Sequence, residues 1–232
     1  MVYQTAGYDI FYHRALDVYG ANWGGLPREI DGTGDDHFDP VLALIGDIPG
    51  CTFMRDVGTK NILMYATATD VAGADPWDEP VAAYAHVADS TGYQGDLAAV
   101  EGNPAVAFNR CPDETDRGVP MFARSVSADG AIGTWSVDPP VELSAEHSGS
   151  VRTSLAVINW VPHVVYYDFN LGSLWHVWGS SATGTEWMEP VLIDDGDGHN
   201  VGAHCSLANI NGRPGVAYQD DTAGTLKYAV LH

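Results

Sequence analysis

Basic residues are scarce in this 232-residue chain. It has 10 lysines and arginines against 31 aspartates and glutamates, which gives a formal net charge of −21, and Lys60 and Lys227 are its only lysines. Such a surface repels a phosphate backbone, so we expect no nucleic-acid partner. The acidic excess is typical of an extracellular or salt-adapted protein, although nothing in the sequence names a compartment.

Long apolar runs, a leader and a cysteine pattern are also missing. No apolar run comes near the ~18 residues of a membrane-spanning helix, so we expect no membrane partner. The opening MVYQTAGYDIFYHRA lacks the basic start and apolar stretch of a signal peptide. The three cysteines (Cys51, Cys111 and Cys205) show no metal-ligand or redox spacing and are interpreted as small core residues.

One pattern is repeated along the chain. The stretch SLAVINWVPHVVYYDFNLGSLWHV begins at residue 154, and the similar stretch SLANINGRPGVAYQDDTAGTLKYA begins at residue 206. Three markers recur at a similar period: a leucine (Leu42, Leu97, Leu155, Leu207), a tryptophan (Trp23, Trp77, Trp135, Trp187) and a mostly aromatic position (Tyr12, Tyr65, Phe122, His176, Tyr228). Markers that recur together at one period indicate a repeat architecture.

Each repeat contains four short β-type runs separated by Gly, Pro, Asn or Asp, and no helical period is found. Four antiparallel strands in about 40 to 50 residues are typical of a propeller blade. We therefore predict an all-β fold, a β-propeller of about five four-stranded antiparallel blades, as a single domain over residues 1–232. The approximate repeats are 1–40, 41–95, 96–153, 154–205 and 206–232.

The first and last blades are predicted to be incomplete. With the strands of a blade named a to d from the axis outward, the first blade has b, c and d, and the fifth has a, b and c. Unpaired edge strands invite pairing with another chain, so a homo-oligomer through the incomplete end blades is one expectation. An imperfect five-bladed ring and a fragment of a longer protein are the alternatives.

The repeat pattern SLAxINGxPxVAYxD…GxLKYA…GxxWxxPVxID resembles the repeats of bacterial sialidase-like and lectin-like β-propellers. The stretch SADGAIGTW, residues 127–135, is similar to the Asp-box of that group, with one extra residue before Gly133. The other copies, DVYGANW, DVAGADPW and SATGTEW, keep only the Gly and the Trp. The resemblance implies the fold more strongly than a function, because these propellers carry many activities.

One face of the disc is predicted to hold a ligand. The d–a linkers and b–c turns lie together on it, and two positions there differ in charge from blade to blade while the rest of the repeat is kept. We expect ligand-binding residues at the start of strand a (Asp39, Gln94, Arg152, His204) and at the end of strand b (Arg55, Arg110, Asp168, Asp220). Repeat proteins specialise at such rims, although loops also vary by default.

No cofactor is predicted, and no residue is assigned to a metal or to catalysis. The acidic loop from Asp194 to Gly198 and the segment from Asp31 to Asp39 have the oxygen-rich content that suits calcium, so calcium is kept as an alternative. His147 and His199 occupy equivalent positions, which is a weaker indication of a transition metal.

The favoured function is a non-enzymatic, lectin-like module that binds a small molecule or a glycan, with a carbohydrate preferred, through the d–a and b–c loops of one face. A sialidase-like glycoside hydrolase, or a fragment of one, is the first alternative. The resemblance implies a three-arginine cluster, for which Arg55, Arg110 and Arg152 are candidates, and Asp168 and Asp220 could pair as carboxylates. A structural or adhesive fragment of a larger surface protein is the second alternative.

Overall fold

The computed structural model describes residues 1–232 except 24, 75, 113–116, 136–139 and 232. Its strands form five antiparallel sheets in chain order, as the repeats predict. The first sheet contains β1 (Val2–Gln4), β2 (Ile10–Tyr12) and β3 (Arg28–Glu29); the second contains β4 (His37–Ile45), β5 (Ile48–Asp56), β6 (Asn61–Thr67) and β7 (Val81–Tyr84).

The remaining sheets repeat this arrangement. The third sheet contains β8 (Ser90–Val100), β9 (Asn103–Cys111), β10 (Val119–Arg124) and β11 (Val141–Glu142); the fourth contains β12 (Ser150–Ile158), β13 (Val161–Asp168), β14 (Ser173–Trp178) and β15 (Val191–Asp194); the fifth contains β16 (Val201–Ile210), β17 (Arg213–Asp220) and β18 (Thr225–Val230). A short 3-10 turn, η2 (Gly196–Gly198), precedes β16. The prediction of five four-stranded blades with incomplete first and last members is confirmed.

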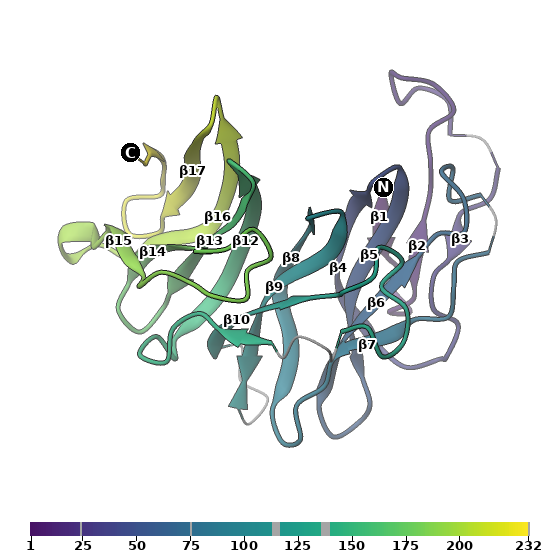
Figure 1. The fold of residues 1–232 in the computed structure, drawn as a ribbon, viewed down its shortest axis with the longest axis horizontal. Coiled ribbons are helices and arrows are strands. Elements are labelled where there is room, and N and C mark those ends of the chain that lie inside the picture. The colour runs from purple at the N-terminus through teal and green to yellow at the C-terminus, as the bar shows by residue number, and fades with distance from the viewer. Residues whose placement is uncertain (24, 75, 113–116, 136–139, 232) are drawn as a thin grey trace.

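The sheets are arranged as a fan around the inner strands. The inner strands β4, β8, β12 and β16 pack side by side, and Figure 1 shows them near the middle of the molecule. The first sheet and the fifth sheet lie at opposite ends of the fan. The sequence allowed the two partial blades to sit side by side in one ring, and the structure does not bring them together.

The strands β5, β9 and β13 are buried almost continuously, so the second, third and fourth sheets each pack on a neighbour through both faces. The first and fifth sheets pack on one neighbour each. Four apolar clusters result, one between each pair of successive sheets. All three cysteines are buried and none of them is in a disulfide, which confirms their interpretation as core residues. The described part of the chain contains no helix long and apolar enough to cross a membrane.

The first three interfaces between successive sheets share one contact, which we call the interlock. In the interlock a glycine–tryptophan turn packs against an aromatic side chain. The turn connects strands c and d of one blade, and the side chain comes from strand c of the preceding blade. The ring pairs are Tyr12 with Trp77, Tyr65 with Trp135, and Phe122 with Trp187, with centroids 5.2, 5.3 and 4.9 Å apart. The recurring tryptophans therefore serve packing between blades.

The Asp-box-like stretch forms one of these turns. Ala131 donates its backbone N–H to the Asp129 carboxylate at 3.1 Å, and the Trp135 indole donates to the Gly130 carbonyl at 2.8 Å. Trp23 and Trp187 donate in the same way to Gly20 and Gly184, both at 2.7 Å. The indole hydrogen bond thus survives in two of the copies that keep only the Gly and the Trp.

Candidate functional site

The inner strands share an unusual backbone feature near their first residues. Asp39, Gln94 and His204 have φ values of 50°, 45° and 50°. Each lies at a β-bulge, where the pairing of strand a with strand b shifts. A left-handed backbone is strained for a residue with a Cβ, and bulges redirect side chains next to functional sites. The backbone is therefore left-handed at the same repeat position in three blades.

Hydrogen bonds and a sulfur contact place these positions next to one another across the fan. The Gln94 N–H donates to Asp39 Oδ2 at 3.3 Å, and Thr153 Oγ1 donates to the Gln94 carbonyl at 3.3 Å. Cys205 Sγ lies 3.9 Å from the Arg152 carbonyl. The inner half of the predicted site is therefore contiguous, and we call it the inner row: Asp39, Gln94, Arg152 and His204.

The side chains of the inner row are largely available. Asp39 and His204 are exposed, and Gln94 and Arg152 are half-buried. Within the described ranges, the side chains of Gln94, Arg152 and His204 make no hydrogen bond or ion pair. The row thus presents a carboxylate, an amide, a guanidinium and an imidazole side by side, and three of these four groups are unengaged.

The outer half of the predicted site consists of Arg55, Arg110, Asp168 and Asp220, and its side chains are already engaged. Arg55 Nε donates to Asp31 Oδ2 at 3.0 Å. Arg110 contacts the carboxylates of Asp89 at 3.3 Å and Glu142 at 3.1 Å. In both blades an arginine at the end of strand b holds an acid of the linker that leads into strand a.

The two aspartates of this outer set accept hydrogen bonds from the backbone of the turns that follow them. Asp168 Oδ1 accepts the backbone N–H groups of Asn170 and Leu171 at 2.9 and 3.1 Å. Asp220 accepts from Ala223 N–H at 2.8 Å, and its Oδ2 lies 2.9 Å from His199 Nδ1. The blade-to-blade change in charge therefore has a structural explanation at these four positions, and their role in ligand binding stays a prediction.

The strongest of these contacts is a buried cluster that we call the linker clamp, formed by Asp31, His37 and Arg55. The side chains of Asp31 and His37 are almost fully buried, and their Oδ2 and Nε2 atoms lie 3.1 Å apart in a close electrostatic contact. Burial alone would raise the pKa of Asp31, but His37 and Arg55 more than offset it and hold that pKa well below its ordinary value. Burial acts to lower the pKa of His37, and the Asp31 carboxylate outweighs it and raises that pKa.

The linker clamp predicts a pH-dependent stability. His37 has a folded-state pKa above its ordinary value of about 6.5, so its contribution is complete below that pH and is lost as the pH rises through the raised pKa. Urea unfolding of the parent and of His37→Gln, compared between about pH 5.5 and pH 8.5, should give a difference in unfolding free energy that narrows as the pH rises. A difference that is constant or widens over this range would contradict the clamp.

The sequence did not single out Asp96, which follows Gln94 by two residues and binds the neighbouring inner strand. Its carboxylate accepts from Leu155 N–H at 2.9 Å and from Ser154 Oγ at 3.0 Å, and Ser154 Oγ accepts from Leu207 N–H at 3.0 Å. Burial raises the pKa of Asp96, although these hydrogen bonds oppose the shift. The chain of contacts ties together β8, β12 and β16, which are the inner strands of the third, fourth and fifth blades. Asp96 directly precedes a marker leucine, so its departure from the other copies was visible in the sequence.

The acidic loops that suggested calcium are engaged within the protein. Asp194 pairs with Lys227 and accepts from Gly196 N–H at 2.8 Å, and Asp31 belongs to the linker clamp. Across the described ranges, no three His, Cys, Asp or Glu side chains are grouped so that they could hold a metal ion.

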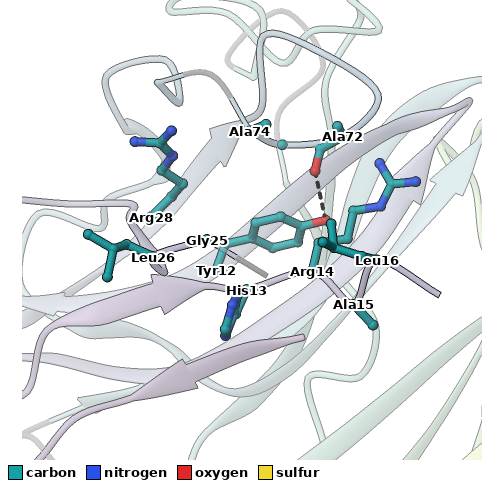
Figure 2. Close-up of a pocket in the computed structure, with 11 residues that line it drawn as sticks. Tyr12, His13, Arg14, Ala15, Leu16, Gly25, Leu26, Arg28, Ala72 and Ala74 are labelled. Atoms are coloured by element: carbon teal, nitrogen blue, oxygen red, sulfur yellow. Dashed lines mark hydrogen bonds between the residues drawn. The ribbon is translucent and has the colours of Figure 1, made fainter. Parts of the chain in front are cut away.

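A cavity of about 250 Å³ lies away from the inner row, between the first and second sheets. Figure 2 shows Arg14 and Arg28 on either side of the Tyr12 ring, whose hydroxyl donates to the Ala72 carbonyl at 3.3 Å. The ring of Tyr12 packs here against the turn that contains Gly73. This cavity borders the first of the interlocks rather than the predicted ligand face.

Comparison with known proteins defines the fold class. Neither a protein-family model nor a curated protein sequence matches the chain. Solved structures do match: an α-L-arabinofuranosidase from Lactobacillus brevis has 9% identity and a TM-score of 0.57 over 100% of this chain and 89% of that one. An endo-arabinase from Bacteroides thetaiotaomicron has 16% identity and a TM-score of 0.58 over 97% of this chain and 86% of that one.

A third similar structure is an exo-β-1,3-galactanase from Phanerochaete chrysosporium in complex with β-1,3-galactotriose. It has 9% identity and a TM-score of 0.51 over 99% of this chain and 58% of that one. The chain therefore has the fold of five-bladed β-propeller glycoside hydrolases. The closer kinship with sialidase-like propellers stays a prediction, because identities this low show the fold alone.

Proposed function

We propose that this protein is a carbohydrate-binding β-propeller whose ligand contacts the inner row. The observation that carries the proposal is the division of the predicted site into engaged and available groups. The outer arginines and aspartates are used within the protein, whereas the inner row keeps three unengaged polar side chains, two of them on a left-handed backbone. Unengaged donors and acceptors in a row suit a hydroxyl-rich ligand.

The fold supports the same class of ligand. The similar structures are named as carbohydrate-active enzymes, and one of them is a complex with galactotriose. Loops and strand ends meet on a rigid scaffold where the inner strands lie side by side, and binding residues are commonly found in such places. A lectin-like role is preferred to catalysis because Asp168 and Asp220, the two carboxylates considered for catalysis, cap turns.

Glycan binding at the inner row is tested by affinity. The 232-residue protein is screened on a glycan array that includes neutral arabino-, xylo- and galacto-oligosaccharides, and the best ligand is titrated by calorimetry. Arg152→Ala should weaken binding about 10-fold or more, because a charge-assisted hydrogen bond is lost. Gln94→Ala should weaken it less.

Arg28→Ala serves as the matched control, since Arg28 is an exposed arginine on an outer strand. It should leave the affinity within about 2-fold of the parent. Equal losses for Arg28→Ala and Arg152→Ala, or no glycan bound at all, would contradict the proposal. Turnover of the selected glycan, abolished by Asp168→Asn or Asp220→Asn, would instead assign a hydrolase.

A further inference from the structure

The fifth blade displays an apolar face that the other blades bury. Tyr228 stands at the same repeat position as Tyr65, yet 58% of Tyr228 is exposed against 1% of Tyr65. Leu226 is equivalent to Leu63 and is 80% exposed. In the second blade these positions pack against the next blade around the turn that contains Trp135. The fifth blade therefore has the residues of a blade interface without the covering turn.

This face is already shaped like its buried counterpart. A methyl group added at Gly50 would come within 2.7 Å of Tyr65 Oη and 3.1 Å of Ile45. A methyl group added at Gly215 would come within 2.7 Å of Tyr228 Oη and 2.6 Å of Ile210. The same glycine, isoleucine and tyrosine contact occurs in both blades, so the exposed tyrosine holds the position that its equivalent has against a partner turn.

The first blade displays the opposite half of the interlock. In the turns of the other blades, a methyl group added at Gly73, Gly130 or Gly184 would overlap the aromatic ring of the preceding blade. At Gly20 the nearest atom belongs to Trp23 of the same turn, at 3.9 Å, so no ring occupies the position. Gly20 has a φ of 66°, close to the 63° of Gly130, and Trp23 is 39% exposed.

The ring of His13, from the same blade, lies 5.3 Å from that of Trp23, and two further aromatic residues of this blade stand at positions that face a preceding blade. The rings of Tyr3 and Phe11 stack with centroids 6.1 Å apart, and both side chains are partly exposed. By repeat position they correspond to Phe53 and Met64, which the second blade packs against the first. The first blade thus presents the turn, strand-b and strand-c parts of a receiving face, and the fifth blade presents the face that fits them.

We propose that the Tyr228 face of one copy of this chain docks on the Gly20–Trp23 turn of a second copy, in a head-to-tail contact that reproduces the interlock between blades. The two faces lie at opposite ends of the fan in one chain, so a second copy brings them together while every packed interface stays intact (Figure 1). Such a contact is heterologous, so two copies either close on each other or add further copies. Because each copy carries a net charge of −21, added salt should strengthen the association.

The test measures the mass of the 232-residue protein in solution by light scattering and sedimentation over a range of concentrations. The parent should self-associate, and Tyr228→Asp and Trp23→Asp should each be monomeric with unchanged circular dichroism. An equimolar mixture of the two variants should form a heterodimer and nothing larger, because each variant keeps one working face. Ile132→Asp replaces an exposed apolar residue on neither face and should associate like the parent.

Three results would overturn the proposal. The first is a parent that stays monomeric at all concentrations and salt levels. The second is a parent that associates while both aspartate variants associate equally well. The third is a chain that brings its own first and fifth blades together. A monomeric Gly20→Cys/Tyr228→Cys variant that forms an intramolecular disulfide would reveal it.

Discussion

Gly130→Ala should lower the unfolding free energy by about 3 kcal/mol, and the melting temperature by about 6–12 °C. Gly130 has a φ of 63°, and a methyl group there would overlap the buried ring of Tyr65. The substitution therefore adds a steric clash in the interlock to the strain of a left-handed backbone. Thermal and urea unfolding give both quantities.

Gly20→Ala is the matched control for this effect. Gly20 occupies the same turn with a φ of 66°, but no ring of a preceding blade lies against it. The control should lose only about 1 kcal/mol, which is the cost of backbone strain. These measurements are made at the lowest concentration that gives a signal, so that association of copies does not contribute. Equal losses at Gly130 and Gly20 would show that the interlock does not stabilise the blade interface.

Arg55→Leu should cost about 3 kcal/mol, because it leaves the carboxylate of Asp31 buried without its guanidinium partner. The Asp31 side chain is 1% exposed, so water cannot replace the lost contact. The pKa of Asp31 is held low in the parent, and the stability gained from it is present at neutral pH and is lost as the pH falls. The gap between parent and variant should therefore narrow below about pH 4.

Arg110→Leu provides the comparison, since Arg110 holds the equivalent position in the next blade. Its partners Asp89 and Glu142 are 22% and 35% exposed, so its loss should cost no more than about 1 kcal/mol. The double variant Asp31→Leu/Arg55→Leu should recover part of the stability lost in Arg55→Leu, because it removes the stranded charge. Similar losses for Arg55→Leu and Arg110→Leu would argue against a buried linker clamp.

Much of the fold could be predicted because the repeat was visible in the sequence. The marker leucines and tryptophans, such as Leu155 and Trp187, fixed the number of sheets and the missing strands of the end blades. The arrangement of those end blades could not be predicted from the pattern, because packing Tyr228 against Trp23 within one chain depends on the angle between successive sheets. That angle is set by the side chains packed at every interface.

The candidate site was predictable in part for a related reason. The register of the repeat selected Gln94 and His204, and the structure places them in a contiguous row. The register could not show that Arg55 is held by Asp31, because the linkers differ in length and follow no common period. It also could not show the left-handed backbone at Gln94, since a bulge adds a residue to the strand without leaving a glycine in that position.

The most direct test of the central claim is a crystal structure of the protein soaked with the oligosaccharide that binds best. We expect a sugar against the inner row, with hydroxyl groups bonded to the Gln94 amide and the Arg152 guanidinium. Unchanged contacts in the linker clamp are expected at the same time. A sugar bound only in the outer cavity beside Tyr12, with the inner row untouched, would contradict the proposed function.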